Sequence, residues 1–199
     1  MIHWLGLQIS GDDFLHKRSH KLLASALLKS QSGFDSRRYE WAFLLGSFQP
    51  DCNPFTFLRG SFHARAFGGH RFSNSQPYIN ARIRNLQRRS VWGTRHYYTL
   101  GKLTHYLADA FTYPHNETFP DTLMDHHRYE TALRLSLAEQ LASPPAVPQV
   151  CCHDLPAAID RLHREYLAAE SDVRSDIRYI LEATGLLMAC CRPAPDLHP

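Results

Sequence analysis

The chain has 199 residues, enough for one domain with a substantial core, and its hydrophobic fraction of 44% is ordinary for a globular protein. A net charge of +3 neither demands nor excludes an anionic partner. No apolar run approaches the roughly 18 residues of a membrane span, and the N-terminal segment lacks the regions of a signal peptide. We therefore expect no transmembrane segment and a cytoplasmic location, with unconventional export as the other option.

The apolar pattern predicts a mostly helical chain. A first helix is expected over residues 16–30 and a second over residues 37–46, ended by Gly46. The turn formers in GSFQPDCNP then predict a loop. Residues 52–74 are rich in Gly and Phe without a clear period, which indicates a long irregular segment of the kind that often carries function.

The second half of the chain continues this pattern. A third helix is expected to begin at Ser75 and Pro77. Its core face would carry Ile79, Ile83 and Leu86, and its outer face Arg82, Arg88 and Arg89. Further helices are predicted over 94–113, over 121–142 and, as two more, up to Met188, before a frayed tail at 190–199. With no internal repeat, we predict an all-α fold: one multi-helix domain over residues 1–199.

The five cysteines form no finger-type metal motif. They are Cys52 and the vicinal pairs Cys151–Cys152 and Cys190–Cys191, an odd count that fits reduced thiols in the cytoplasm. The 13 histidines are a compositional oddity, since histidine is the commonest metal ligand.

The segment HYLADAFTYPHN places His105 and Asp109 one turn apart on a helix, with Pro114 just before His115. Helix geometry alone puts His105 and Asp109 opposite the leucine stripe, where a solvated polar face is expected. The later segment HHRYE changes this interpretation. Its His126 and Glu130 interrupt an apolar stripe, where they need a partner.

That partner could be a hydrogen bond within the pair or a metal ion shared with the first segment. Two histidine–carboxylate pairs that flank one loop can converge on adjacent cations. The mixed nitrogen and oxygen ligands suit zinc, with manganese or iron as alternatives. Two further residues are candidates: His20, which competes with His16 on the face of Leu23, and Asp51, which also fits a simple turn role.

These residues resemble the zinc-dependent phospholipase C family of bacteria, which is related in fold to the trinuclear-zinc single-strand nucleases. HYLADAFTYPHN and HHRYE resemble its paired helix motifs, the second in the form HxxYE. GSFQPDCNP resembles the loop that carries a functional Asp. GHRF, with His70, resembles the next His-aromatic stretch, for which His63 competes, and RSHKLLASALL resembles the first helix.

The resemblance implies an all-α fold with a zinc cluster between helices. One zinc would be held by His70, His105 and Asp109, a second by His115, His126 and Glu130, and Asp109 would bridge to a third shared with His20. Asp51 would act as general base or would orient the attacking water. The third site stays open, because the family's N-terminal Trp ligand corresponds to an internal Trp4, with His3 as an alternative. Cys52 replaces an aromatic residue of the choline-recognising members.

Three functions follow from these observations. The leading hypothesis is a metal-dependent phosphodiesterase that cleaves a phospholipid or a soluble phosphodiester, with peripheral membrane contact. A nuclease is the second, because a basic stretch could follow phosphates; it comprises Arg82, Arg84, Arg88, Arg89 and Arg95, with Tyr97 and Tyr98 nearby. The third is a non-enzymatic helical module that a metal stabilises.

Overall fold

The computed structural model describes residues 11–31, 33–52, 72–116, 123–148 and 152–193, without the side chains of 11–17, 51, 52, 74, 123, 124, 126 and 127. Within these ranges the chain forms seven α-helices, one short 3-10 helix and no strand, which confirms the all-α class. They are α1 (Gly11–Lys29), α2 (Arg37–Cys52), α4 (Phe72–Gln87), α5 (Thr94–Ala110), η2 (Tyr113–His115), α6 (Leu123–Gln140), α7 (Leu155–Ala168) and α8 (Val173–Cys190). Of the described helices, none is long and apolar enough to cross a bilayer.

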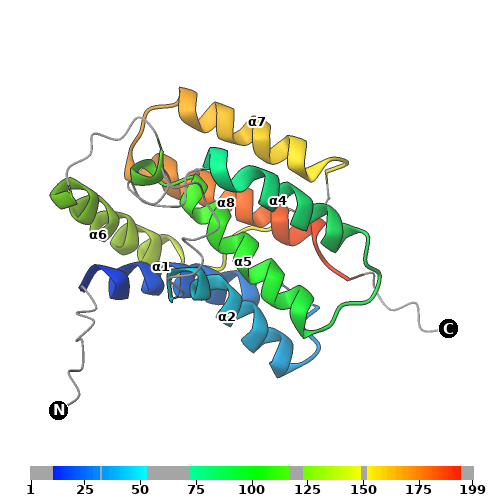
Figure 1. Ribbon diagram of the computed structural model, residues 1–199. Helices are drawn as coiled ribbons and strands as arrows, with labels where there is room; N and C mark the ends of the chain where they lie inside the picture. The colour runs from blue at the N-terminus through cyan, green and yellow to red at the C-terminus, as the bar shows by residue number, and fades with distance from the viewer. Residues whose placement is uncertain (1–10, 32, 53–71, 117–122, 149–151, 194–199) are drawn as a thin grey trace, which may run out of the picture.

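Helix α5 lies in the middle of the bundle and packs against α1, α2, α4 and α8 (Figure 1). The predicted apolar stripes are confirmed: the core includes Leu100, Leu103 and Leu107 of α5 and Ile79, Ile83 and Leu86 of α4. The arginines predicted to face water, Arg82, Arg88 and Arg89, are exposed. Because neighbouring helices cover α5 on several sides, polar side chains of α5 can form a site that is buried between helices.

The predicted end of a helix at Gly46 is wrong. Helix α2 continues through Gly46 and Pro50 as far as Cys52, so this part of the expected loop is helical. Both residues disfavour a helix interior, and Pro50 cannot donate a backbone hydrogen bond to the carbonyl of Gly46. Packing against α5 therefore outweighs local propensity here. The irregular segment expected over 52–74 is also wrong at its end, because α4 begins at Phe72, three residues before the expected start at Ser75. Residues 53–71 lie outside the described chain.

Two glycines let α2 and α5 approach closely. A Cβ atom at Gly46 would overlap the carbonyl oxygen of Tyr98, and one at Gly101 would overlap that of Phe43. Either atom would meet rigid backbone, so a substitution must push the helices apart. This close contact brings the main chain of α2 to the polar face of α5.

Replacing Gly101 by alanine is therefore expected to destabilise the protein by about 2–4 kcal/mol, in spite of the helix propensity that alanine adds. Gly185→Ala is the matched control, because its new Cβ would meet the Pro148 side chain at 3.3 Å, in a loop that can shift slightly. We expect the control to change the free energy of unfolding by no more than about 1 kcal/mol. Urea unfolding measures both; equal stability of the two variants would contradict the close-contact explanation.

Helix α5 ends three residues before the predicted boundary, and the chain then forms η2. Pro114 accounts for the break, because the residue before a proline is disfavoured in the α conformation. The short turn is closed by hydrogen bonds from the backbone N–H of His115 to Thr112 O (2.9 Å) and from that of Asn116 to Tyr113 O (3.0 Å). His115 is thereby presented directly beyond the end of α5.

The end of α8 is also more ordered than predicted. Cys190 and Cys191, which the sequence assigned to a frayed tail, are buried in the core. The backbone N–H of Cys152 donates to Cys190 Sγ at 3.2 Å, and the two Sγ atoms lie 3.5 Å apart as hydrogen-bonded thiols. This contact anchors the end of α8 on the segment before α7. Residues 194–199 lie outside the described chain.

Candidate metal centre

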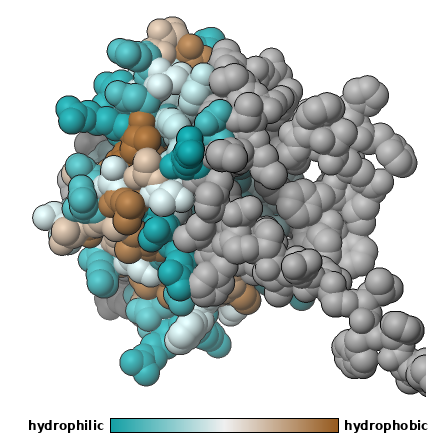
Figure 2. All heavy atoms as spheres, turned by 90° about the vertical axis from the view of Figure 1, so that its left-hand side faces the viewer, coloured by the Kyte–Doolittle hydropathy of each residue, from teal (hydrophilic) through white to brown (hydrophobic). Residues whose placement is uncertain are grey.

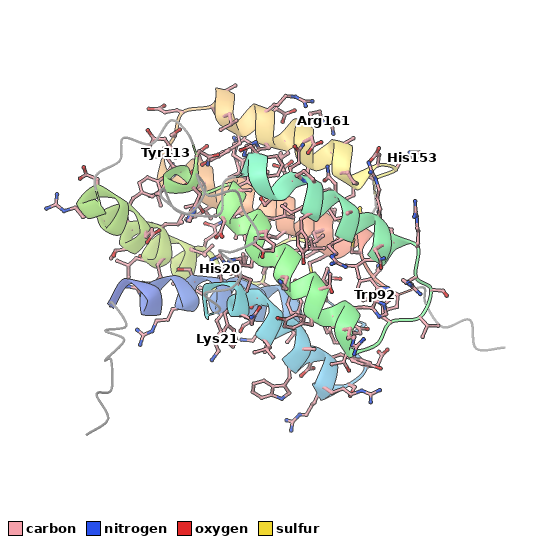
Figure 3. The ribbon with its side chains drawn as sticks, in the orientation of Figure 1. His20, Lys21, Trp92, Tyr113, His153 and Arg161 are labelled. Atoms are coloured by element: carbon pink, nitrogen blue, oxygen red, sulfur yellow. The ribbon has the colours of Figure 1, made fainter. Side chains whose placement is uncertain are left out.

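The carboxylate of Asp109 is the centre of the site, and two histidines approach it from different helices. His105 precedes Asp109 by one turn of α5, and its Nε2 lies 3.2 Å from Asp109 Oδ2. His20 comes from α1, and its Nε2 lies 3.1 Å from Asp109 Oδ1. Figure 3 shows His20 directed into the bundle, whereas Lys21 points outward. Each carboxylate oxygen thus faces one imidazole nitrogen.

All three side chains are buried. The exposed fraction is 0% for His105, 4% for Asp109 and 7% for His20, so the solvated polar face expected from the geometry of α5 alone is wrong. Removing such groups from water is costly unless they are paired. The cluster therefore needs positive charge close to the carboxylate.

The main chain of α2 sets the orientation of the His105 ring. His105 Nδ1 lies 3.0 Å from the carbonyl oxygen of Ser47, which only accepts hydrogen bonds, so we assign the proton to Nδ1. In the neutral ring, Nε2 then presents its lone pair to Asp109 Oδ2. Two acceptors at 3.2 Å repel each other unless they share a proton or a metal cation. Metal-binding histidines are commonly held in this way through their second nitrogen.

Electrostatics favours the ionised form of Asp109. Burial raises the pKa of this carboxyl, but the positive charges of His105 and His20, and that of His115, outweigh burial and hold the pKa well below its usual range. Those charges exist only when the imidazoles are protonated. A divalent cation supplies positive charge to the same carboxylate and leaves the imidazoles neutral as ligands.

A cavity of about 30 Å³ joins this cluster to a second polar pair. His20, Asp109, His115 and Glu130 all contribute to its wall. His115 Nε2 lies 3.9 Å from Glu130 Oε1, and these side chains are 13% and 9% exposed. Much of the remaining wall is apolar and includes Leu23, Leu133, Leu137 and Ile180. The structure thus brings the two sequence motifs to one cavity, in surroundings that strengthen electrostatic interactions.

Four of the predicted site residues line this cavity: His20, Asp109, His115 and Glu130. A fifth, His105, lies behind Asp109 and contacts its carboxylate. Asp51 and His126 belong to α2 and α6, but their side chains lie outside the described residues. The same is true of the side chain of His16. The remaining predicted or competing residues lie wholly outside the described chain: His3, Trp4, His63 and His70.

A metal ion fits the first cluster. Among the described histidines, cysteines and carboxylates, one group offers three ligand atoms within 4.8 Å of one another, and it consists of His20, His105 and Asp109. Two imidazole nitrogens and a carboxylate oxygen are a donor set that zinc accepts. The family resemblance implies that these residues serve two ions that share Asp109, and in the structure the three side chains lie side by side.

Two residues in contact with the elements that carry the site were not predicted from the sequence. Ser47 acts through its main-chain carbonyl, which has no side-chain motif. Asp176 accepts three hydrogen bonds, one each from η2, α6 and α7. It could have been found, because it lies one turn before Ile180 in the apolar stripe of α8, where a buried carboxylate needs partners.

The comparison with protein families identifies the family of the chain. A family model described as zinc dependent phospholipase C matches residues 19–173, more than three quarters of the chain. The chain belongs to the zinc-dependent phospholipase C family. No curated protein and no solved structure gave a significant match. The resemblance to the phospholipase C family is therefore confirmed, and His20, His105 and Asp109 form a candidate metal site within the matched residues.

Proposed function

We propose that the protein is a zinc-dependent phosphodiester hydrolase of the phospholipase C type. The observation that carries the proposal is the buried convergence of His20 and His105 on Asp109, beside a cavity that also contains His115 and Glu130. Membership of the family supports zinc as the cofactor and a phosphodiester as the bond that is cleaved.

The proposal assigns two zinc ions to the residues of the two motifs, and the existence of a third stays a prediction of the resemblance. The first ion would be held by His105 and Asp109 with His70, and the second by His115, His126 and Glu130. A third would share Asp109 with His20. Zinc bound there would polarise phosphoryl oxygens and lower the pKa of a bound water.

The chain's own residues have separate tasks. Ser47 holds the His105 ring through Nδ1, so that Nε2 stays directed at Asp109. Asp51, in the last turn of α2, is the proposed general base or orienting group for the attacking water. The apolar wall, with Leu133 and Leu137, limits the access of bulk water to the polar side chains.

Two exposed side chains support contact with a lipid surface. Trp41 is 69% exposed and Leu45 is 49% exposed, and they lie one turn apart on α2. On the face drawn in Figure 2, hydrophobic side chains form small separate groups among hydrophilic ones. Tryptophan is favoured at membrane–water interfaces. We therefore propose that α2 makes peripheral contact with a membrane and that the substrate is a phospholipid.

The proposed location is the cytoplasm, because Cys152 and Cys190 lie side by side as reduced thiols.

The nuclease alternative receives less support from the arrangement of the basic residues. Arg88 and Arg89 lie between α4 and α5, and Arg95 is in the first turn of α5. Asp109 follows Arg95 by 14 residues of the same helix, which corresponds to about 21 Å. The basic stretch is thus a solvated surface at the far end of α5 from the metal cluster.

Hydrolysis of a chromogenic phosphocholine diester by the zinc-loaded protein tests the proposal, with single-stranded DNA at two salt concentrations as the comparison substrate. We expect release of the chromophore, little cleavage of DNA, and loss of turnover in His126→Ala. Faster cleavage of DNA would favour the nuclease. A protein that binds zinc and cleaves neither substrate would be the non-enzymatic module.

Trp41→Ala separates a lipid surface from a soluble substrate. If α2 contacts the membrane, this variant should hydrolyse phospholipid vesicles about tenfold more slowly, because roughly 1.4 kcal/mol of interfacial contact is lost, and should hydrolyse the soluble diester at the wild-type rate. Val91→Ala is the control, since Val91 is 79% exposed but lies between α4 and α5. Equal vesicle rates for the two variants would argue against contact through α2.

A further inference from the structure

Asp176 is a fully buried carboxylate that the metal cluster does not use. It lies in the first turn of α8, beyond the residues that the family model matches, and its exposed fraction is 0%. Its Oδ2 accepts hydrogen bonds from the backbone N–H of Tyr113 (2.8 Å) and from the hydroxyl of Tyr129 (2.9 Å). Its Oδ1 accepts one from the hydroxyl of Tyr166 at 2.8 Å. One carboxylate thus joins η2, α6 and α7 to α8.

Two of these donors are close in sequence to proposed ligands of the second zinc. Tyr113 begins the single turn of η2 that ends at His115. Tyr129 directly precedes Glu130 on α6, and its ring packs edge-on against the ring of Tyr113, with centroids 5.8 Å apart. Figure 3 shows Tyr113 next to the first turns of α6. The oxygen Oδ2 therefore lies at the point where the two ligand-bearing elements meet.

Because of the local backbone geometry, fixing Tyr113 and Tyr129 also fixes the positions of His115 and Glu130. The backbone of η2 is closed by the hydrogen bond from His115 N to Thr112 O, so a fixed Tyr113 fixes the start of the turn that carries the imidazole. Glu130 follows Tyr129 on a regular helix, and rotation of α6 about its axis would break the hydroxyl bond to Asp176. His115 and Glu130 come from different elements and are 3.9 Å apart, so their relative position depends on such a link.

Burying a carboxylate costs more free energy than burying an apolar side chain that makes only packing contacts. Burial raises the pKa of Asp176 to about 6, although the hydrogen bonds from Tyr113, Tyr166 and Tyr129 lower it. Burial, followed by the charge of Asp176, raises the pKa of the Tyr129 hydroxyl well above its usual value, so this group remains a donor. An apolar side chain could fill the space at less cost, but it could not hold both elements at one point.

We propose that Asp176 is a positioning residue that holds His115 and Glu130 in register to bind the second zinc ion. The inference rests on the proposed function, because it assigns a task within the proposed second site. Asp176 acts through Tyr113 and Tyr129 and does not touch the metal. Groups that orient metal ligands usually change metal affinity by about 10- to 100-fold when they are removed.

The test is a calorimetric titration of the metal-free protein with zinc, which counts the ions and measures their affinities. The Tyr129→Phe substitution removes the hydroxyl that donates a hydrogen bond to Asp176 Oδ2. In this variant we expect the second ion to bind about 10- to 100-fold more weakly and the affinity of the first ion to be unchanged. Asp176→Asn, in which one acceptor oxygen becomes an N–H donor, should have the same effect.

Tyr97→Phe is the matched control. It also removes a buried hydroxyl hydrogen bond, to Gly33 O at 2.8 Å, but on the part of α5 away from the cluster. It should bind both ions as the wild type does while lowering thermal stability by a similar amount. Wild-type affinity for the second ion in Tyr129→Phe, or equal weakening in both variants, would overturn the role of Asp176. A wild-type protein that binds no second ion would instead overturn the proposed second site and this inference with it.

Discussion

Replacing Asp109 by asparagine should abolish both zinc binding at the first cluster and phosphodiester hydrolysis. Asparagine keeps the shape of the side chain but removes its charge and directs an N–H donor at one of the two histidines. Both oxygens of Asp109 are used, one by His20 and one by His105, so no orientation of the amide replaces them. We expect kcat/KM to fall at least ~10³-fold, equivalent to about 4 kcal/mol of lost transition-state stabilisation.

The comparison variant is Asp154→Asn. Asp154 caps α7, where its side chain accepts a hydrogen bond from the backbone N–H of Ala157 at 3.1 Å. Asparagine is an equally good capping residue, so zinc content and activity should stay at the wild-type level. Hydrolysis of the soluble diester and zinc content are measured for both proteins. An Asp109→Asn variant that retains even a tenth of the wild-type activity would contradict a catalytic metal on this carboxylate.

Removal of zinc should also destabilise the fold. In the metal-free protein, the positive charge near the buried Asp109 carboxylate depends on protonation of the imidazoles around it. If zinc is present at about 1,000 times its dissociation constant, its binding contributes about 4 kcal/mol to stability. For a chain of this size, a strong chelator should then lower the melting temperature by about 10 °C.

The same chelator should leave the melting temperature of Asp109→Asn nearly unchanged, because that variant has little zinc to lose. Adding zinc back should restore the wild-type value. Thermal unfolding followed by circular dichroism provides the measurement. A chelator that lowers the melting temperature of both proteins equally would show that the stabilising metal lies elsewhere.

The helices could be predicted from the sequence where regularly spaced apolar residues mark the face that becomes buried. Ile79, Ile83 and Leu86 define one face of α4, and the structure buries them as expected. The pattern failed at Gly46, because a glycine that ends one helix in isolation can equally allow close contact with another helix. Only the neighbouring helix distinguishes these roles, and its position is not written in the local sequence.

The spacing of side chains in the sequence predicted which residues form the site, but the sequence predicted the surroundings of those side chains only in part. His105 and Asp109 were recognised by their spacing, yet α5 alone predicted that they face water. Their burial depends on α1 and α2, which come from elsewhere in the chain. The orientation of His105 depends on the carbonyl of Ser47, a group that every residue possesses. Such contacts follow from tertiary packing and leave no pattern at the positions involved.

The most direct test of a zinc centre on Asp109 is the zinc content of freshly purified protein, measured by mass spectrometry of the element alongside the Asp109→Asn variant. We predict two zinc ions per wild-type chain and a loss of at least one in the variant, with hydrolysis of the diester lost in parallel. A wild-type protein that contains no zinc and takes up none on incubation would contradict the assignment of His20, His105 and Asp109 as metal ligands.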